Sequence, residues 1–215
     1  MVVRRGESRI PAAVAVLVAV AAQSLLSYQL LPGPRFLLPA VEVVLLVGLV
    51  GSDPSRLSSQ SKDLRLLSIA LIGVVGLANA YALVRLLDQL IGGQGNGRDL
   101  LASAAGVWIT NVVVFGLAWW ELDRGGPLGR AGARPAPNHP DLWFPQDGDA
   151  KAETPAGWHP VFVDYAFVSL TAATAFSPTD TMPLTPRAKL LMGAQSLISL
   201  LTVGLVAARA VNILH

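Results

Sequence analysis

Charged side chains within the long apolar blocks of this sequence are the first candidates for chemistry. A charge inside a membrane span is energetically costly. We therefore take such a residue as a candidate functional residue and look for the side chain that pairs with it. Glu42 lies six residues in from Phe36, at one end of its block. Arg85 lies six residues in from Ile91, at one end of the next block. If both blocks are helices that end at the same surface, the two side chains lie about 9 Å deep and can pair.

Asp88 follows Arg85 by three residues, so it can join the pair of Glu42 and Arg85 on one helix face. The favoured interpretation is a structural ion pair that holds two helices together. An ion or proton pathway is the alternative, because both roles place paired charges inside a membrane.

Two asparagines also lie at matching depths in neighbouring apolar blocks. Asn79 is twelve residues and Asn111 eleven residues from the outer ends of their blocks, so both lie roughly 17 Å down. Hydrogen bonds between helices are their favoured role, ahead of a ligand site. Further polar residues in the first and last blocks can line a wet cavity or hold the helices together: Gln23, Gln195, Ser196 and Ser199.

The most distinctive stretch runs from residue 164 to residue 187. An apolar helix is predicted to carry hydroxyls at its carboxyl end and to be followed by a turn with one acid; the candidate residues are Thr171, Thr174, Ser177, Pro178, Thr179, Asp180 and Arg187. In a pore, the hydroxyls face water, whereas in a structural helix they bond to backbone carbonyls one turn earlier. We expect the turn to be ordered at the outer membrane surface, with Asp180 paired to Arg187 or Lys189 or accepting backbone amides. Thr185 is expected to cap the last helix.

The elements that position these residues follow from composition. The chain has 215 residues, of which 53% are hydrophobic and 14% charged, whereas a soluble domain carries about 25% charged residues. Unpaired backbone groups are not tolerated in lipid, and the apolar blocks are continuous rather than alternating, so helices are expected. The sequence predicts an all-α, polytopic transmembrane bundle of about six helices, at 10–31, 36–51, 66–91, 100–120, 161–176 and 188–214.

Three parts are predicted along the chain: a four-helix transmembrane part at 1–120, a flexible cytoplasmic loop at 121–160, and a helical hairpin at 161–215. The loop is rich in proline, glycine and charge, a composition typical of disorder. Six full crossings and the bias of basic residues place both termini in the cytoplasm, in the cell membrane. Whether 161–176 crosses fully or turns back is left open.

Composition also narrows the functional classes. There is no cysteine, which excludes disulfides and thiolate chemistry, and a net charge of +2 is too small to favour nucleic acid. His139 and His159 lack the spacing of a metal site. We therefore expect no enzyme activity, cofactor or metal, with the lipid bilayer as partner and a homo-oligomer as an open alternative.

The run from Thr174 to Asp180, with Pro183 three residues later, resembles the pore region of two-helix potassium channels. There a pore helix ends in Thr-Val-Gly-Tyr-Gly-Asp, and a proline follows three residues after the aspartate. Ser177 and Thr179 replace both filter glycines, so the resemblance does not imply potassium selectivity.

The whole chain is similar to a family of uncharacterised bacterial multi-pass membrane proteins. The similarity rests on Tyr165-Ala166-Phe167, Ala175-Phe176-Ser177-Pro178-Thr179-Asp180-Thr181, Arg187 and Val211-Asn212. It implies a shared fold in the bacterial inner membrane and brings no activity. The expected function is that of a channel-like or small-solute or ion transport protein. A structural or partner-binding membrane protein without transport activity is the alternative.

Overall fold

The structure is a computed structural model, which describes residues 7–8, 10–31, 33–34, 37–51, 60–93, 96–130, 139–148, 158–175 and 180–213. Six helices of 13 residues or more account for most of them: α1 (Ile10–Gln23), α2 (Leu37–Gly51), α3 (Gln60–Ile91), α4 (Gly97–Leu122), α6 (Phe162–Thr174) and α7 (Pro186–Ile213). The shorter elements are the 3-10 turns η1 (Tyr28–Leu30), η2 (Asp123–Gly125) and η3 (Pro145–Asp147), the short helix α5 (Gly126–Arg130), and the strands β1 (Leu142–Trp143) and β2 (Met182–Pro183). The predicted all-α bundle is confirmed.

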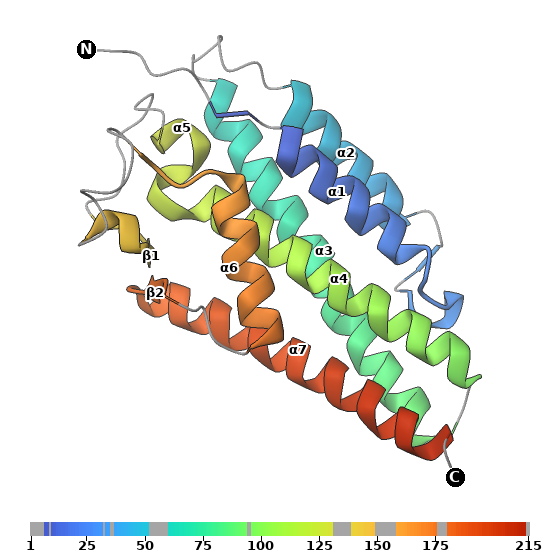
Figure 1. Cartoon of the computed structure of the whole chain (residues 1–215). Helices are drawn as coiled ribbons and strands as arrows, with labels where there is room; N and C mark the ends of the chain where they lie inside the picture. The colour runs from blue at the N-terminus through green and yellow to red at the C-terminus, as the bar shows by residue number, and fades with distance from the viewer. Residues whose placement is uncertain are drawn as a thin grey trace, which may run out of the picture.

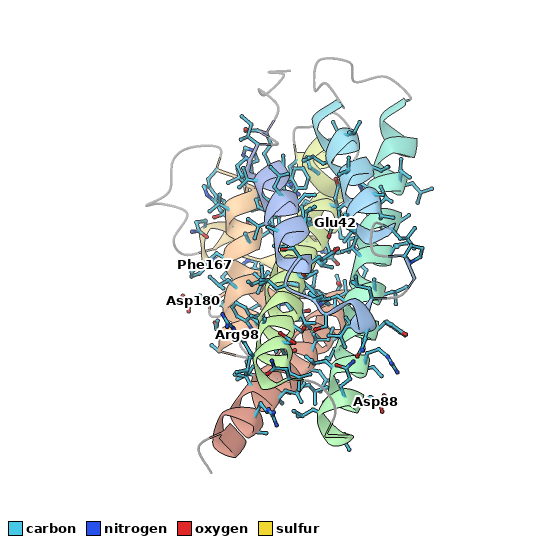
Figure 2. The ribbon with its side chains drawn as sticks, turned by 90° about the vertical axis from the view of Figure 1, so that its right-hand side faces the viewer. Glu42, Asp88, Arg98, Phe167 and Asp180 are labelled. Atoms are coloured by element: carbon cyan, nitrogen blue, oxygen red, sulfur yellow. The ribbon has the colours of Figure 1, made fainter. Side chains whose placement is uncertain are left out.

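The long apolar blocks form the long helices. Within the described residues, three stretches are long and apolar enough to cross a membrane: Arg65–Ile91, Gly97–Arg130 and Pro186–Arg209. Helices α1 and α6 are also apolar but shorter. The outward faces carry exposed aliphatic and aromatic side chains, including Leu77, Phe167 and Leu190, which are 75%, 57% and 75% exposed (Figure 2). Such faces suit lipid, because apolar residues all round a helix are stable only in a core or a membrane.

Helix α4 is the centre of the bundle. It packs against α1 and α3 on one side and against α6 and α7 on the other (Figure 1). A glycine allows one of these approaches, since a Cβ at Gly106 would lie 2.7 Å from the carbonyl oxygen of Ala22 in α1. At Gly116 a Cβ would meet the Cα of Ala166 in α6 at 3.4 Å, an ordinary van der Waals contact, so the closest approach that needs a glycine is that of α4 to α1. Small residues at such crossings permit close helix packing.

Helix α6 does not continue to the far end of the bundle. The chain beyond it returns to β2, which pairs antiparallel with β1 through Leu142 opposite Pro183 and Trp143 opposite Met182. Strand β1 lies beside the first turn of α6, because the rings of Phe144 and Tyr165 are 5.6 Å apart. Met182 is therefore level with the beginning of α6, and residues 176–179 between them lie outside the described part.

Helix α7 starts from this same end and runs past α6. Ser196, ten residues into α7, donates to the carbonyl of Ala172 near the end of α6 at 3.4 Å. Helix α7 then continues to Ile213, so α6 stops about halfway along it. The turn before α7 was predicted at the outer surface, opposite the start of 161–176. Its described residues, 180–183, instead lie at the end of the bundle where α6 begins, because β1 holds β2 there.

The two ends of the described chain lie at opposite ends of the bundle. Trp120, at the end of α4, donates to the Glu7 carboxylate at 2.7 Å. Arg209 lies against Gly97, at the beginning of α4. The described residues near the two termini therefore lie at opposite ends of the bundle, whereas both termini were expected on one side; the side of a membrane that each terminus faces stays a prediction.

The polar region from residue 121 to 160 also differs from the prediction. Residues 121 and 122 complete α4, and residues 123–130 and 139–148 fold onto the end of the bundle with η2, α5, β1 and η3. Leu142 and Phe144 are 0% and 4% exposed, so they pack into protein rather than into headgroups. A loose loop is therefore not what these residues form, while 131–138 and 149–157 lie outside the described part.

Candidate functional site

The interface of α6 with α4 and α7 is a polar seam inside an apolar bundle. Ser169 of α6 donates to the carbonyl of Val112 in α4 at 2.6 Å. Gln195 of α7 donates to the carbonyl and the hydroxyl of Ser169 at 2.8 and 2.7 Å. Both Ser169 and Gln195 are 0% exposed. Three helices are thus joined at mid-length by hydrogen bonds that lipid cannot replace.

The two predicted asparagines hold neighbouring helices, as expected for their favoured role. The Asn111 amide donates to the Ser199 hydroxyl at 2.9 Å and to the Gln195 carbonyl at 3.2 Å. Asn79 of α3 donates to the Val107 carbonyl in α4 at 3.1 Å. They do not bond to each other. Asn111 belongs to the polar seam, whereas Asn79 joins α3 to α4.

Two buried oxygens in the seam have no hydrogen-bond partner within the described residues, Oδ1 of Asn111 and Oε1 of Gln195. Buried polar atoms are normally bonded, so each orphan calls for an explanation such as a water or an ion. The carboxyl end of α6, where a helix dipole is negative, lies a short distance further along the same interface. The two oxygens can therefore accept further hydrogen bonds, for example from water.

The hydroxyls of α6 follow the structural alternative. Thr171 donates to the carbonyls of Phe167 and Val168 at 3.0 Å, and Thr174 donates to the carbonyl of Leu170 at 2.9 Å. Both therefore bond to backbone one turn earlier rather than being reserved for a shared aqueous space. Ser177, Pro178 and Thr179 lie outside the described residues.

Of the two alternatives predicted for Asp180, the ion pair with a basic residue of α7 is not found among the described residues, whereas the acceptance of backbone amides stays a prediction. Asp180 is exposed, and no ion pair links it to another described residue. Arg187 pairs instead with Asp141, whose other oxygen accepts from Thr185 at 2.5 Å. The predicted cap is confirmed, because the backbone amide of Ala188 donates to the Thr185 hydroxyl at 3.1 Å.

The predicted pair of Glu42 and Arg85 is wrong. Glu42 accepts a hydrogen bond from Gln23 of α1, while Arg85 pairs with Asp88 at 3.3 Å on the outside of the bundle (Figure 2). The error lies in the assumption that α2 and α3 end at one level. Helix α2 has 15 residues and α3 has 32, and Glu42 lies beside Ile72, thirteen residues before Arg85. Thirteen residues of helix separate the two levels by roughly 20 Å.

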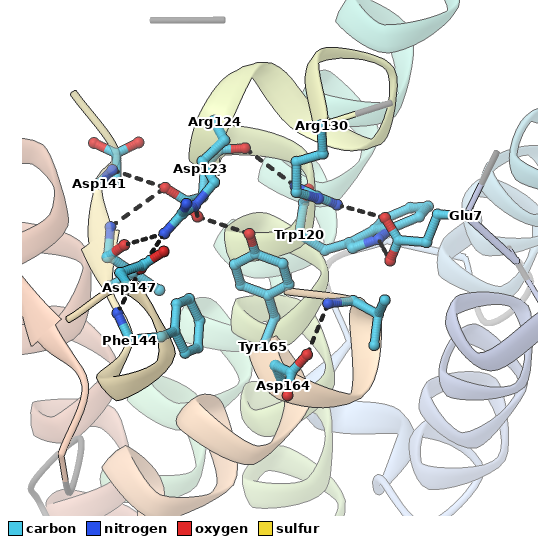
Figure 3. A network of polar contacts seen from close by, with 12 residues as sticks. Glu7, Trp120, Asp123, Arg124, Arg130, Asp141, Phe144, Asp147, Asp164 and Tyr165 are labelled. Carbon is cyan, nitrogen blue, oxygen red and sulfur yellow. Dashed lines mark hydrogen bonds and ion pairs between the residues drawn. The ribbon is translucent and has the colours of Figure 1, made fainter. Parts of the chain in front are cut away.

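A second group of polar residues, which we name the anchor network, closes the end of the bundle from which α6 starts (Figure 3). Its centre is Asp123, just after α4, which is 0% exposed. One carboxylate oxygen accepts the backbone amides of Asp141 and Leu142 at 2.7 and 3.3 Å. The other accepts the Tyr165 hydroxyl at 2.7 Å and the Arg124 guanidinium at 3.2 Å. Asp123 thereby joins α4, β1 and α6.

Arg130 and Glu7 extend the anchor network to the segment before α1. Arg130 donates to Glu7 at 2.9 Å and to the carbonyl of Trp120 at 2.9 Å, and its guanidinium lies 4.9 Å from the Tyr165 ring centre. Glu7 also accepts the amide of Phe162, the first residue of α6, at 2.7 Å. Sequence reasoning missed this network because its charges sit in a region whose composition is typical of a solvated loop.

Arg124 keeps its charge within this network. Burial alone lowers the pKa of its guanidinium, but the hydrogen bond to Asp147 and the charges of Asp123 and Asp147 outweigh burial, so the pKa lies above its ordinary value. Arg124 also donates to the carbonyl of Leu142 at 3.2 Å. It therefore serves as a fixed cation that holds β1 and η3 against the end of α4.

In comparisons with known proteins, no family model, curated protein or solved structure matches the chain. Among the described residues, no group of three or more His, Asp or Glu side chains is placed to hold a metal ion. The polar seam and the return of the chain after α6 are thus the features from which a function is inferred.

Proposed function

We propose that the chain is a multi-pass membrane protein with five crossings and one re-entrant hairpin, and that it acts as a channel-like or small-ion transport protein. One observation carries the proposal: α6 stops beside the middle of α7, and the chain returns to the end from which it came. A half-length helix followed by a return is the architecture in which irregular backbone reaches membrane depth.

The surroundings of the hairpin support a transport role. Irregular backbone at membrane depth is tolerated only where protein buries it or where it lines an aqueous cavity. In transport proteins, such broken helices bring helix ends and backbone carbonyls to ions near the bilayer midplane. Here the polar seam of Ser169, Gln195 and Asn111 lies beside the second half of α6, and two of its oxygens have no hydrogen-bond partner within the described residues, which supports this role.

Basic residues support an orientation with the anchor network in the cytoplasm. The described residues at that end include Arg65, Arg124, Arg130, Arg187 and Lys189, whereas Arg98 and Arg209 lie at the other end. By sequence, Arg4, Arg5 and Arg9 before α1 and Arg56 between α2 and α3 add to the first group, as does Lys62 in the first turn of α3, whereas Arg35 before α2 adds to the second. An excess of basic residues favours the inner side of a cell membrane. The hairpin then enters from the cytoplasm, and the carboxyl end of α7 faces outwards.

A structural or partner-binding role is the second candidate. The observation that favours it is the bonding of the Thr171 and Thr174 hydroxyls to the backbone of their own helix. A helix whose hydroxyls are already bonded has less to offer a permeating ion. Transport and structural roles therefore differ in a measurable ion flux.

The re-entrant topology predicts the labelling pattern of single cysteines, which the chain lacks naturally. Cysteine at Ser8 and at Met182, both exposed, should react with a membrane-impermeant thiol reagent from the same side of the membrane. Cysteine at Asn96, in the exposed turn before α4, should react only from the other side. Right-side-out and inverted vesicles give the two measurements. If Met182→Cys reacts from the side of Asn96→Cys, the segment crosses fully and the hairpin is not re-entrant.

Ion flux tests the proposed activity directly. Liposomes that contain the purified protein should release sodium, potassium or protons faster than empty liposomes. Asn111→Leu, which removes the amide joining α4 to α7, should change that rate, because it alters the polar seam. Asp88→Asn is the matched control, since Asp88 is exposed on the outside of α3 and should leave the rate unchanged. Liposomes that release none of these ions faster than protein-free liposomes would favour the structural role.

A further inference from the structure

Glu42 is a carboxyl group enclosed by apolar helices. It lies near the middle of α2 and is 1% exposed. Beside it is a cavity of about 10 Å³, and the other residues that line this cavity are apolar, from α1 (Val16, Ala19), α3 (Ile72, Val75) and α4 (for example Val113). None of these lining residues is charged or titratable. Figure 2 shows Glu42 among the helices, higher in the view than the labelled charged residues Asp88, Arg98 and Asp180.

Gln23 is the polar partner of this carboxyl. Its amide nitrogen donates to Oε1 of Glu42, and Gln23 itself is 7% exposed. Oε2 of Glu42 and Oε1 of Gln23 have no hydrogen-bond partner within the described residues. Within the described residues, the three acceptor oxygens of this pair therefore share one donated hydrogen bond, which goes to Oε1 of Glu42. An ionised carboxylate in such a place lacks a counter-charge, which is a costly state.

The size of the cavity beside Glu42 indicates which cation the carboxyl can bind. A volume of about 10 Å³ holds one water molecule at most. Metal ions such as Ca²⁺ take about six to eight oxygen ligands, far more than the two free oxygens available here. A proton needs one acceptor oxygen and almost no volume. The unpaired Oε2 of Glu42 fits that requirement.

We propose that Glu42, with Gln23, forms a reversible proton-binding site between α1 and α2. A hydronium ion gives its proton to Oε2, an O–H bond forms on the carboxyl, and water is released. On deprotonation the proton returns to water, and Oε1 keeps the amide hydrogen bond from Gln23. No electrons are transferred. This site lies on α1 and α2, apart from the hairpin, and does not rest on the proposed transport activity.

Infrared difference spectroscopy of the purified full chain in phosphatidylcholine nanodiscs tests the site. A protonated carboxylic acid has a carbonyl stretch that ionised carboxylates lack. We expect this band in the wild-type protein at neutral pH and its reversible loss at alkaline pH. Glu42→Gln should lose the band. Asp88→Asn should retain it, because Asp88 is an exposed, ion-paired carboxylate on α3.

A second variant covers the case in which Glu42→Gln does not fold. Gln23→Leu keeps the carboxyl but removes its hydrogen-bond donor, so the band should shift to higher frequency. A wild-type protein without the band at neutral pH would overturn the proposal. A band that persists in Glu42→Gln, stays unshifted in Gln23→Leu, or fails to titrate would do the same. Absence of ion flux from liposomes bears on the hairpin proposal and leaves the band unaffected.

Discussion

Replacing Asp123 with alanine is expected to lower the free energy of unfolding by about 3–5 kcal/mol, the range measured when one partner of a buried ion pair is removed. The Asp123 side chain is 0% exposed and accepts from the Tyr165 hydroxyl, the Arg124 guanidinium and the amides that begin β1. Without the carboxylate these donors are buried without an acceptor, which costs free energy for each of them.

Thermal and denaturant unfolding in detergent, followed by near-ultraviolet circular dichroism, measures this effect. Trp119 and Trp120 are both 0% exposed near Asp123, so their signal reports on this end of the bundle. Asp88→Ala is the matched control: its ion pair with Arg85 is on the surface, where such pairs contribute about 0–1 kcal/mol. Equal losses for Asp123→Ala and Asp88→Ala would show that the anchor network does not stabilise the fold.

The helices could be predicted because their signal is local. A long continuous apolar block needs a helix in lipid, and the blocks at 66–91 and 100–120 correspond to α3 and α4. The return after α6 has no such local signal. It depends on pairing between Leu142–Trp143 and Met182–Pro183, forty residues apart, which no window of hydrophobicity contains.

Contacts in the candidate site could be predicted only where the chemistry of one side chain requires a partner in a neighbouring helix. Asn79 and Asn111 bond across helices, because an amide inside an apolar helix must find a partner. The number of residues from the end of each apolar block predicted the wrong partner for Glu42, because α2 and α3 differ in length. The anchor network could not be predicted, because Glu7 and Arg130 are 123 residues apart in the sequence and form their ion pair only in the folded chain.

Arg130→Met is expected to lower the free energy of unfolding by about as much as Asp123→Ala does, for a different reason. The Arg130 side chain is 1% exposed, and that of Glu7 is 4% exposed. Removing the guanidinium leaves the Glu7 carboxylate buried with two neutral donors, the Trp120 indole and the Phe162 amide. An uncompensated buried charge costs about 3–5 kcal/mol. Arg98→Met, at an exposed position on α4, is the control and should leave stability nearly unchanged.

The double variant Glu7→Gln with Arg130→Met separates the charge from the packing. Arg130→Met leaves the Glu7 carboxylate without its counter-charge, and Glu7→Gln removes that carboxylate. Glutamine still offers an oxygen to the Trp120 indole. The double variant should therefore lose less stability than the sum of the single losses, by about 0.5–3 kcal/mol, as for residues in direct contact. Additive losses in the unfolding curves would show that Glu7 and Arg130 act independently. The segment before α1 would then be held to α5 and α6 by contacts other than this ion pair.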